Sequence, residues 1–165
     1  MSLFAPITKL SDEEAEDAIQ SFISIVKFET VSAIGATNGS YDLCVKFLST
    51  LCILSSLTDV KVIEESKPGK PILRASWIGL DPTLPCILLN SHYDVVPANP
   101  LDWMIPPFEA VRKDGRIYGR GTQDMKCVCV QYIAAIKKLI SCGFKPIRTV
   151  HLTFVPDEEI GLNAS

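Results

Sequence analysis

The sequence predicts an α/β fold with a mixed, largely parallel sheet flanked by helices. Two short apolar runs, at residues 85–91 and 149–155, have the length and composition of buried strands. A helical pattern over residues 124–141, with Gly143 in position to cap its end, separates them. A strand, a crossover with a helix and a second strand form a βαβ unit, which makes the strands parallel. We expect the first strand to be central and buried on both faces.

The residues before this unit predict two helices. Ser11 and Glu14 form a capping-box pattern, and apolar residues then recur at helical spacing as far as Val26. A loop at residues 33–40, rich in glycine, serine, threonine and asparagine, leads to a second helix whose apolar face begins at Tyr41. Both helices can cover the sheet with their apolar faces.

Further strands are expected on both sides of the first apolar run. Residues 59–65 alternate as a strand, residues 66–70 turn, and residues 72–77 form the next strand. The segment 98–121 contains several prolines and glycines together with aromatic residues. We interpret it as a functional loop with a short strand at residues 116–118.

Composition and charge favour a soluble protein without basic binding surfaces. Of the 165 residues, 47% are hydrophobic, which is enough for a substantial core, and the net charge is −3. The basic residues are scattered, so neither nucleic acid nor a membrane is expected as a partner. Residues 1–6 show no secretion signal, and the apolar stretch 47–57 is too short to span a bilayer, so we expect a cytoplasmic location.

The six cysteines are interpreted as buried free thiols and not as a disulfide or zinc framework. No CxxC pair occurs, and each cysteine lies within an apolar helix or strand pattern. Cys127 and Cys129 are two residues apart on the predicted helix, so their side chains diverge instead of converging on a metal.

Three groups of polar residues are expected at one edge of the sheet. His92 and Asp94 follow the first strand of the βαβ unit, and Glu158 and Glu159 follow the second. Asp124 opens the intervening helix and would lie at the same edge. Because open α/β sheets bind ligands outside the carboxyl ends of their strands, these side chains can form one site.

The residue types and their spacing fit a metal-dependent hydrolase. Asp94 lies two residues after His92, on the same side of an extended chain, and can accept the second N–H of the imidazole. Asp124 can bridge two cations through its two oxygens. Of the adjacent Glu158 and Glu159, one can bind metal while the other exchanges a proton with the attacking water and the leaving amine. Such ligands suit Zn²⁺, with Co²⁺ or Mn²⁺ as alternatives.

Each of these residues also has a purely structural interpretation. A histidine at a strand end can simply be hydrogen-bonded, Asp124 can be a helix N-cap, and adjacent glutamates can be solvated. His151, the other histidine of the chain, alternates with apolar residues and is interpreted as structural. The occurrence of all three polar groups at one sheet edge favours the metal site.

The motifs resemble those of the co-catalytic zinc hydrolases, which include aminoacylase-1, carnosinases and acetylornithine deacetylase. An HxD motif at His92, a GRGxxDMK motif at residues 119–126 and a DEEIG motif at residues 157–161 carry this resemblance. It covers residues 22–161 and is strongest to the aminoacylase-1-like members.

The resemblance implies roles for the five candidate residues. His92 and Asp124 would bind one zinc ion, and Asp124 and Glu159 a second. Glu158 would be the general base, and Asp94 would support His92. The peptide bond that follows Asp124 is implied to be cis.

The activity implied by the resemblance is zinc-dependent hydrolysis of N-acyl-L-amino acids to a carboxylate and a free amino acid. The implied substrate is a small N-acylated amino acid, and the implied assembly of the complete enzyme is a homodimer. Dipeptidase, carboxypeptidase or deacetylase activity is an alternative, because these relatives have the same metal site.

The resemblance also implies that residues 1–165 are the N-terminal portion of a zinc catalytic domain. In the family, another carboxylate and another histidine complete the metal site downstream, and an inserted domain dimerises and helps to bind the substrate carboxylate. After Gly161 the sequence departs from the family pattern, which usually continues with a second glycine. We expect this chain alone to be inactive, with a companion chain that supplies ligands, or a truncated and catalytically incomplete relative, as alternatives.

Overall fold

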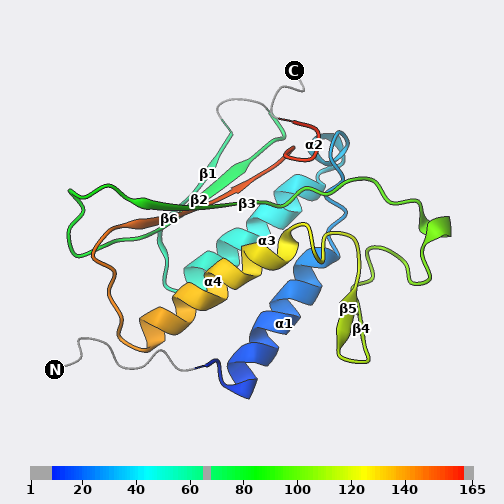
Figure 1. The fold of residues 1–165 in the computed structure, drawn as a ribbon. Helices are drawn as coiled ribbons and strands as arrows, with labels where there is room; N and C mark the ends of the chain where they lie inside the picture. Colours follow the sequence, from blue (N-terminus) through cyan, green and yellow to red (C-terminus); the bar gives the residue numbers. More distant parts are fainter. Residues whose placement is uncertain (1–8, 65–67, 162–165) are drawn as a thin grey trace.

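The computed structural model describes residues 9–64 and 68–161. A four-stranded sheet carries three long helices on the same side (Figure 1). The expectations for residues 1–6, for part of the turn at 66–70 and for the sequence after Gly161 lie outside the described residues.

The sheet is mixed and has the strand order β1-β2-β6-β3. Pairing is antiparallel between β1 and β2 and between β2 and β6, whereas β3 and β6 are parallel. The α/β class and the parallel βαβ pair are therefore confirmed, although β3 and β6 are the only parallel pair in the described sheet. The strands are β1 (Thr58–Ile63), β2 (Ile72–Trp77), β3 (Ile87–His92) and β6 (Val150–Val155).

The expectation that residues 85–91 form a central strand buried on both faces is wrong for the described sheet. β3 lies at its edge, and Ile87 and Leu88 are 46% and 59% exposed. The interior strand of the parallel pair is β6, in which Leu152 and Phe154 are fully buried. An apolar run indicates burial but does not say which neighbours a strand has, so the pattern could not assign the order.

The three long helices form the second part of the fold. α1 begins with the predicted capping box, in which the Glu14 N–H donates to Ser11 Oγ at 3.2 Å and the Ser11 N–H donates to Glu14 Oε2 at 2.7 Å. α3 and α4 contact the strands, and α1 packs against α4. No helix in the described ranges has the length and apolar character needed to cross a membrane. The helices are α1 (Asp12–Val26), α3 (Ser40–Leu54) and α4 (Lys126–Ser141).

The hydrophobic core lies between the sheet and the helices. Alternate residues of β2 and β6 face it, while the side chains between them form hydrogen bonds on the other face, such as that between Ser76 and His151 at 2.9 Å. The buried members of the hydrophobic core include Ile25, Tyr41, Cys44, Leu48, Leu73, Tyr93, Cys129, Ile133, Leu152 and Phe154.

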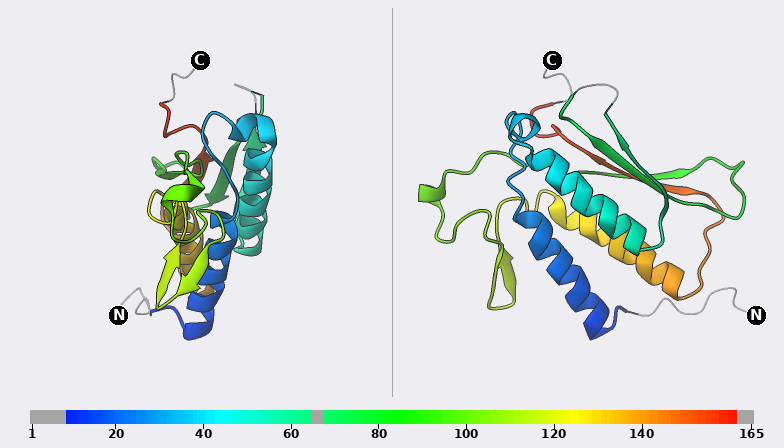
Figure 2. Two further views of the ribbon diagram at one scale, coloured as in Figure 1. Left: turned by 90° about the vertical axis from the view of Figure 1, so that its right-hand side faces the viewer. Right: turned by 180° about the vertical axis from the view of Figure 1, so that it is seen from behind.

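Two segments predicted as loops contain short elements. The loop at 33–40 holds α2 (Gly35–Asn38). The segment 98–121 holds a hairpin of β4 (Val111–Lys113) and the predicted β5 (Arg116–Tyr118), which lies apart from the main sheet (Figure 2). An ion pair of 2.7 Å between Arg112 and Glu16 connects this hairpin to α1.

All six cysteines are free, as predicted, but they differ in burial. Cys44, Cys52 and Cys129 are buried, whereas Cys86 and Cys142 are exposed. The interpretation as buried small hydrophobic residues therefore holds for the core cysteines and is wrong for the two that lie near the ends of β3 and α4.

We expect Leu152→Ala to destabilise the protein by about 2–5 kcal/mol, because Leu152 is fully buried in the interior of the sheet. Leu88→Ala removes the same atoms from a side chain that is 59% exposed, and we expect it to cost less than about 1 kcal/mol. Chemical denaturation of both variants measures the difference. Equal losses would contradict the assignment of β6 to the interior and β3 to the edge.

Candidate metal site

The carboxyl ends of β3 and β6 bring the five candidate residues to one edge of the sheet. His92 is the last residue of β3, and Asp94 follows it. Glu158 and Glu159 follow the end of β6, which lies beside His92 because the two strands are parallel. Asp124 precedes α4, which returns the chain from β3 to β6. This is the edge at which open α/β sheets bind ligands.

The side chains of His92, Asp124 and Glu159 are arranged so that they could hold a metal ion. One ligand atom from each lies within 4.8 Å of the other two, and His92 Nε2 is 3.1 Å from Asp124 Oδ1. His92 is buried, Glu159 is half-buried and Asp124 is exposed. An ion at this position would have a protein wall on one side and access to solvent on the other.

Asp94 is a fully buried carboxylate that connects the two strand ends. Its Oδ1 accepts the N–H of Glu158 and its Oδ2 accepts the N–H of Glu159, both at 3.2 Å. The Ser32 hydroxyl donates to Oδ2 at 2.8 Å. On the other side, Oδ1 lies 3.3 Å from His92 Nδ1, and the Asp94 carbonyl oxygen lies 3.1 Å from the same nitrogen. With Nδ1 engaged in this way, Nε2 of His92 is left to face Asp124.

The electrostatics of this site favour a cation. Burial opposes a charge on His92, but the hydrogen bond and charge of Asp94 and the charge of Glu158 outweigh it and raise the pKa of His92 to about 9. Burial and then the charge of Asp124 raise the pKa of Glu159. Four carboxylates thus surround one imidazole, and a divalent ion would offset their mutual repulsion.

A pocket of about 420 Å³ opens beside Asp124 and Glu159. Trp103 and Arg120 form another part of its wall, with the guanidinium carbon 5.2 Å from the centroid of the indole ring. Arg120 also donates to the carbonyl of Pro97 at 3.4 Å. Both aromatic and cationic groups therefore lie next to the candidate ligands.

Comparisons with known proteins bear on the same residues. The model of peptidase family M20/M25/M40 matches residues 88–165, a range that contains all five candidates. The chain is 40% identical over 156 residues to aminoacylase-1 of Homo sapiens and, over the same length, to aminoacylase-1B of Rattus norvegicus. The chain is thus similar to peptidase family M20/M25/M40 over residues 88–165 and to aminoacylases over most of its length.

Solved structures share the fold of this chain. A di-peptidase from Saccharomyces cerevisiae matches with a TM-score of 0.75 at 22% identity, over 90% of this chain. An M20 family metallo-carboxypeptidase from Sulfolobus solfataricus matches with a TM-score of 0.71 at 30% identity, over 92% of this chain. The mixed sheet and its helices are therefore the fold of known M20 proteins.

The chain spans about a third of the length of these proteins. The aligned residues are 94% of this chain but 37% of human aminoacylase-1. For the yeast di-peptidase and the archaeal carboxypeptidase, the shared part is 33% and 32% of the solved chain.

The approach to α4 is the part of the candidate site that differs most from the sequence prediction. The helix begins at Lys126, so Asp124 lies before it and is not its N-cap. The peptide bond between Asp124 and Met125 is cis, as the resemblance implied. The Asp124 side chain contacts His92, with 3.1 Å between Asp124 Oδ1 and His92 Nε2.

Lys126 is a residue of this site that sequence reasoning missed. It is fully buried, its Nζ donates to the carbonyl of Phe28 at 2.5 Å, and burial lowers its pKa to about 8. Gly121 has a φ of +83°, and a Cβ there would come within 2.7 Å of Val95 and 3.1 Å of Lys126. A lysine directly before the apolar run at residues 127–130 was the available signal for its burial.

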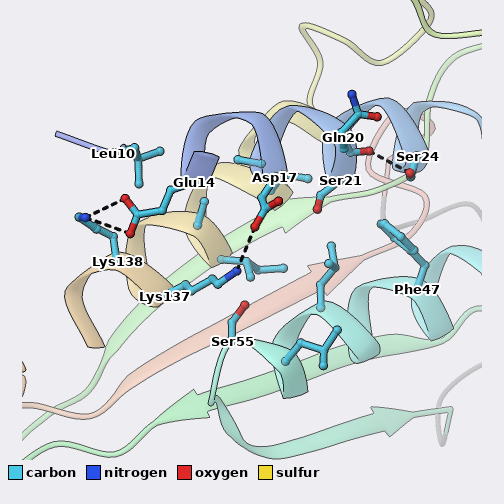
Figure 3. A pocket seen from close by; sticks show the side chains of 16 residues that line it. Leu10, Glu14, Asp17, Gln20, Ser21, Ser24, Phe47, Ser55, Lys137 and Lys138 are labelled. Carbon is cyan, nitrogen blue, oxygen red and sulfur yellow. Dashed lines mark hydrogen bonds and ion pairs between the residues drawn. The ribbon is translucent and has the colours of Figure 1, made fainter. Parts of the chain in front are cut away.

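Another pocket, of about 370 Å³, lies between α1, α3 and α4 (Figure 3). Glu14 and Lys138 form an ion pair of 2.7 Å at its rim, with an apolar floor from the three helices. Its lining comes from the helices and their ends, so it is separate from the candidate metal site.

We expect Asp94→Ala to destabilise the metal-free protein by roughly 3 kcal/mol, because the part-buried N–H groups of Glu158 and Glu159 lose their acceptor and the buried Ser32 hydroxyl loses one of its two acceptors. Burial raises the Asp94 pKa, but bonds from His92, Ser32 and the backbone outweigh it and lower the pKa overall. The stabilisation is therefore present above the ordinary carboxyl pKa and is lost as the pH falls through the lowered value.

Urea denaturation in the presence of a chelator, repeated between neutral and acidic pH, measures both effects. Asp59→Ala, which removes a partly exposed ion pair with Arg74, is the matched control and should cost less than about 1 kcal/mol. An Asp94→Ala variant with the stability and acid dependence of the unmodified protein would contradict the role assigned to Asp94.

Proposed function

We propose that the chain belongs to a zinc-dependent amidohydrolase that cleaves N-acyl-L-amino acids to a carboxylate and a free amino acid. The observation that carries this proposal is the convergence of His92, Asp124 and Glu159 in a chain that is 40% identical over 156 residues to human aminoacylase-1. Because the matched part is 37% of that relative, the activity is proposed for the complete protein that contains these residues.

The donor atoms fit the proposed metal. One imidazole nitrogen and carboxylate oxygens are ligands that Zn²⁺ accepts, and Co²⁺ or Mn²⁺ can replace it. We assign His92 and Asp124 to one ion and Asp124 and Glu159 to a second. Zinc bound there would polarise the amide carbonyl and make a water molecule more acidic. Catalytic zinc sites have three protein ligands as a rule, so this assignment requires a further protein ligand for each ion.

Glu158 is the proposed general base. Its side chain is 58% exposed, and its Oε2 lies 3.6 Å from His92 Nε2, so its carboxylate borders the space between the ligands. A carboxylate in this position can take a proton from the attacking water and deliver it to the leaving amine. Asp94 supports this arrangement by holding the backbone N–H of Glu158 at 3.2 Å.

The pocket beside Asp124 and Glu159 is the proposed substrate site. Its volume of about 420 Å³ is within the range of small-molecule sites, about 300–1,000 Å³. Trp103 can contact an apolar part of the substrate, and Arg120 places a positive charge at the wall. These features are compatible with a small N-acylated amino acid.

A peptidase is the second candidate. The archaeal metallo-carboxypeptidase is 30% identical to this chain and shares its fold with a TM-score of 0.71. A dipeptide, a C-terminal peptide bond and an N-acyl amino acid all present an amide carbonyl next to a carboxylate-bearing residue. A deacetylase, or a truncated relative without catalysis, completes the alternatives that the motifs allow.

Cytoplasmic location, a homodimer of the complete enzyme and a companion chain for the missing ligands remain predictions. The resemblance to aminoacylase-1 is what supports the dimer. The need for more zinc ligands than His92, Asp124 and Glu159, the group found among the described residues, is what supports a longer or second chain.

In the complete protein, we expect Glu158→Ala to lower the hydrolysis of an N-acetyl-L-amino acid by at least about 10²-fold while zinc stays bound, because Glu158 moves protons and is not a proposed ligand. His92→Ala should instead lower the zinc content. His151→Ala is the matched control, because His151 is bonded to Ser76 in the sheet.

Turnover of the N-acetyl amino acid and of a dipeptide, together with zinc stoichiometry, measures these effects. Near-normal turnover by Glu158→Ala would sink the general-base assignment, and unchanged zinc in His92→Ala would remove His92 from the ligand set. Faster cleavage of the dipeptide would favour the peptidase.

A further inference from the structure

A second buried carboxylate, besides that of Asp94, lies directly before the glutamate pair. Asp157 is 6% exposed and has a φ of +60°, in the left-handed region. Aspartate is found in this region more often than most residues, but the conformation still has to be held by its surroundings. Glu158 and Glu159 directly follow this turn. The backbone conformation of Asp157 therefore sets the direction in which the chain continues through both glutamates.

The Asp157 side chain turns away from the candidate ligands and is bound on both oxygens. The Tyr41 hydroxyl on α3 donates to Oδ1 at 2.7 Å. Lys70, which precedes β2, forms an ion pair with Oδ2 at 2.5 Å. These contacts come from two other parts of the chain, so the carboxylate fixes the turn after β6 to α3 and to the start of β2.

Tyr41 is itself held rigidly. Its ring is 1% exposed and packs edge-on against Tyr93, with 5.3 Å between the ring centroids. A Cβ at Gly35 would lie within 2.0 Å of the Tyr41 ring, so the close approach requires glycine there. The Tyr93 hydroxyl donates to the carbonyl of Pro71 at 2.6 Å. Burial, followed by Asp157, raises the pKa of Tyr41 well above its usual range, and its hydroxyl stays a donor.

We propose that Asp157 is a positioning residue for the metal site. Held by Tyr41 and Lys70, it fixes the turn from which Glu159 presents its carboxylate to the metal and Glu158 faces the substrate. Asp94 holds the N–H groups of the same pair from the other side. This inference rests on the metal site of the proposed function and adds to it a residue that is not a ligand.

The test is the affinity and absorption spectrum of Co²⁺ in the complete protein. Asp157→Gly removes both contacts, and because glycine adopts a positive φ without strain, a loss does not come from a strained backbone. We expect Co²⁺ to bind about 10–100-fold more weakly, the size typical for supporting residues of metal ligands, with a changed visible spectrum.

Two further variants separate positioning from general stability. Asp157→Asn keeps an acceptor for Tyr41 and suits the left-handed region, so it should restore most of the Co²⁺ affinity. Val150→Ala, at the opposite end of β6, should lower the stability of the fold and leave Co²⁺ affinity and spectrum unchanged. A residue that only stabilises the fold would make Asp157→Gly behave like Val150→Ala.

Tyr41→Phe provides an independent test, because it removes one hydrogen bond and keeps the ring that packs against Tyr93. It should weaken Co²⁺ binding less than Asp157→Gly, and the double variant should be no weaker than Asp157→Gly alone. If Asp157→Gly does not fold, Tyr41→Phe carries the test.

The outcomes are distinguishable. Unchanged Co²⁺ affinity and spectrum in Asp157→Gly, or in Tyr41→Phe if that variant carries the test, would overturn this inference and leave the metal site intact. Failure of the unmodified protein to bind Co²⁺ would overturn the proposed metal site, and this inference with it.

Discussion

The site depends on the contacts that the buried carboxylate of Asp94 makes with its donors. A charged group without access to water is unfavourable unless donors surround it, and Asp94 receives them from three separate segments. Ser32 follows α1, the N–H groups of Glu158 and Glu159 follow β6, and His92 ends β3. The need to satisfy one carboxylate therefore brings together three parts of the chain that are distant in sequence.

Backbone contacts make this arrangement rigid. The Ser32 N–H donates to the carbonyl of Val95 at 3.0 Å, and the Val95 N–H donates to the carbonyl of Thr30 at 2.9 Å. The Thr30 hydroxyl donates to the carbonyl of Tyr93 at 2.6 Å. The segment after α1 thus runs alongside the segment after β3 and keeps Asp94 in place. A second buried carboxylate, Asp157, connects the turn after β6 to α3 and to the start of β2. The position of the site residues therefore depends on contacts with several elements of the fold.

Local sequence patterns predicted much of this fold. The capping box at Ser11, the strand at residues 72–77, the strand at residues 116–118 and the parallel pair all depend on residues near in sequence or on a general rule of chain connection. The edge position of β3 was missed, because an apolar run does not reveal which strands lie beside it. The same limit applies to Cys86, whose apolar neighbours indicated a burial that the edge does not provide.

For the candidate site, the sequence predicted which residues lie together but not all of the contacts that hold them. Strand ends and helix starts mark His92, Asp124 and the glutamate pair as neighbours, because topology alone brings them to one edge. The partners of Asp157, by contrast, lie on α3 and before β2, and no local pattern connects them. Lys126 was missed for a similar reason, since its acceptor, the carbonyl of Phe28, is a backbone group distant in sequence.

The most direct test of the metal site is a crystal structure of the complete protein grown with zinc, measured on both sides of the zinc absorption edge. An anomalous peak about 2.0–2.2 Å from His92 Nε2, with carboxylate oxygens of Asp124 and Glu159 around the proposed ion positions, is the predicted result. Zinc bound elsewhere, or no peak between these side chains at saturating zinc, would contradict the account.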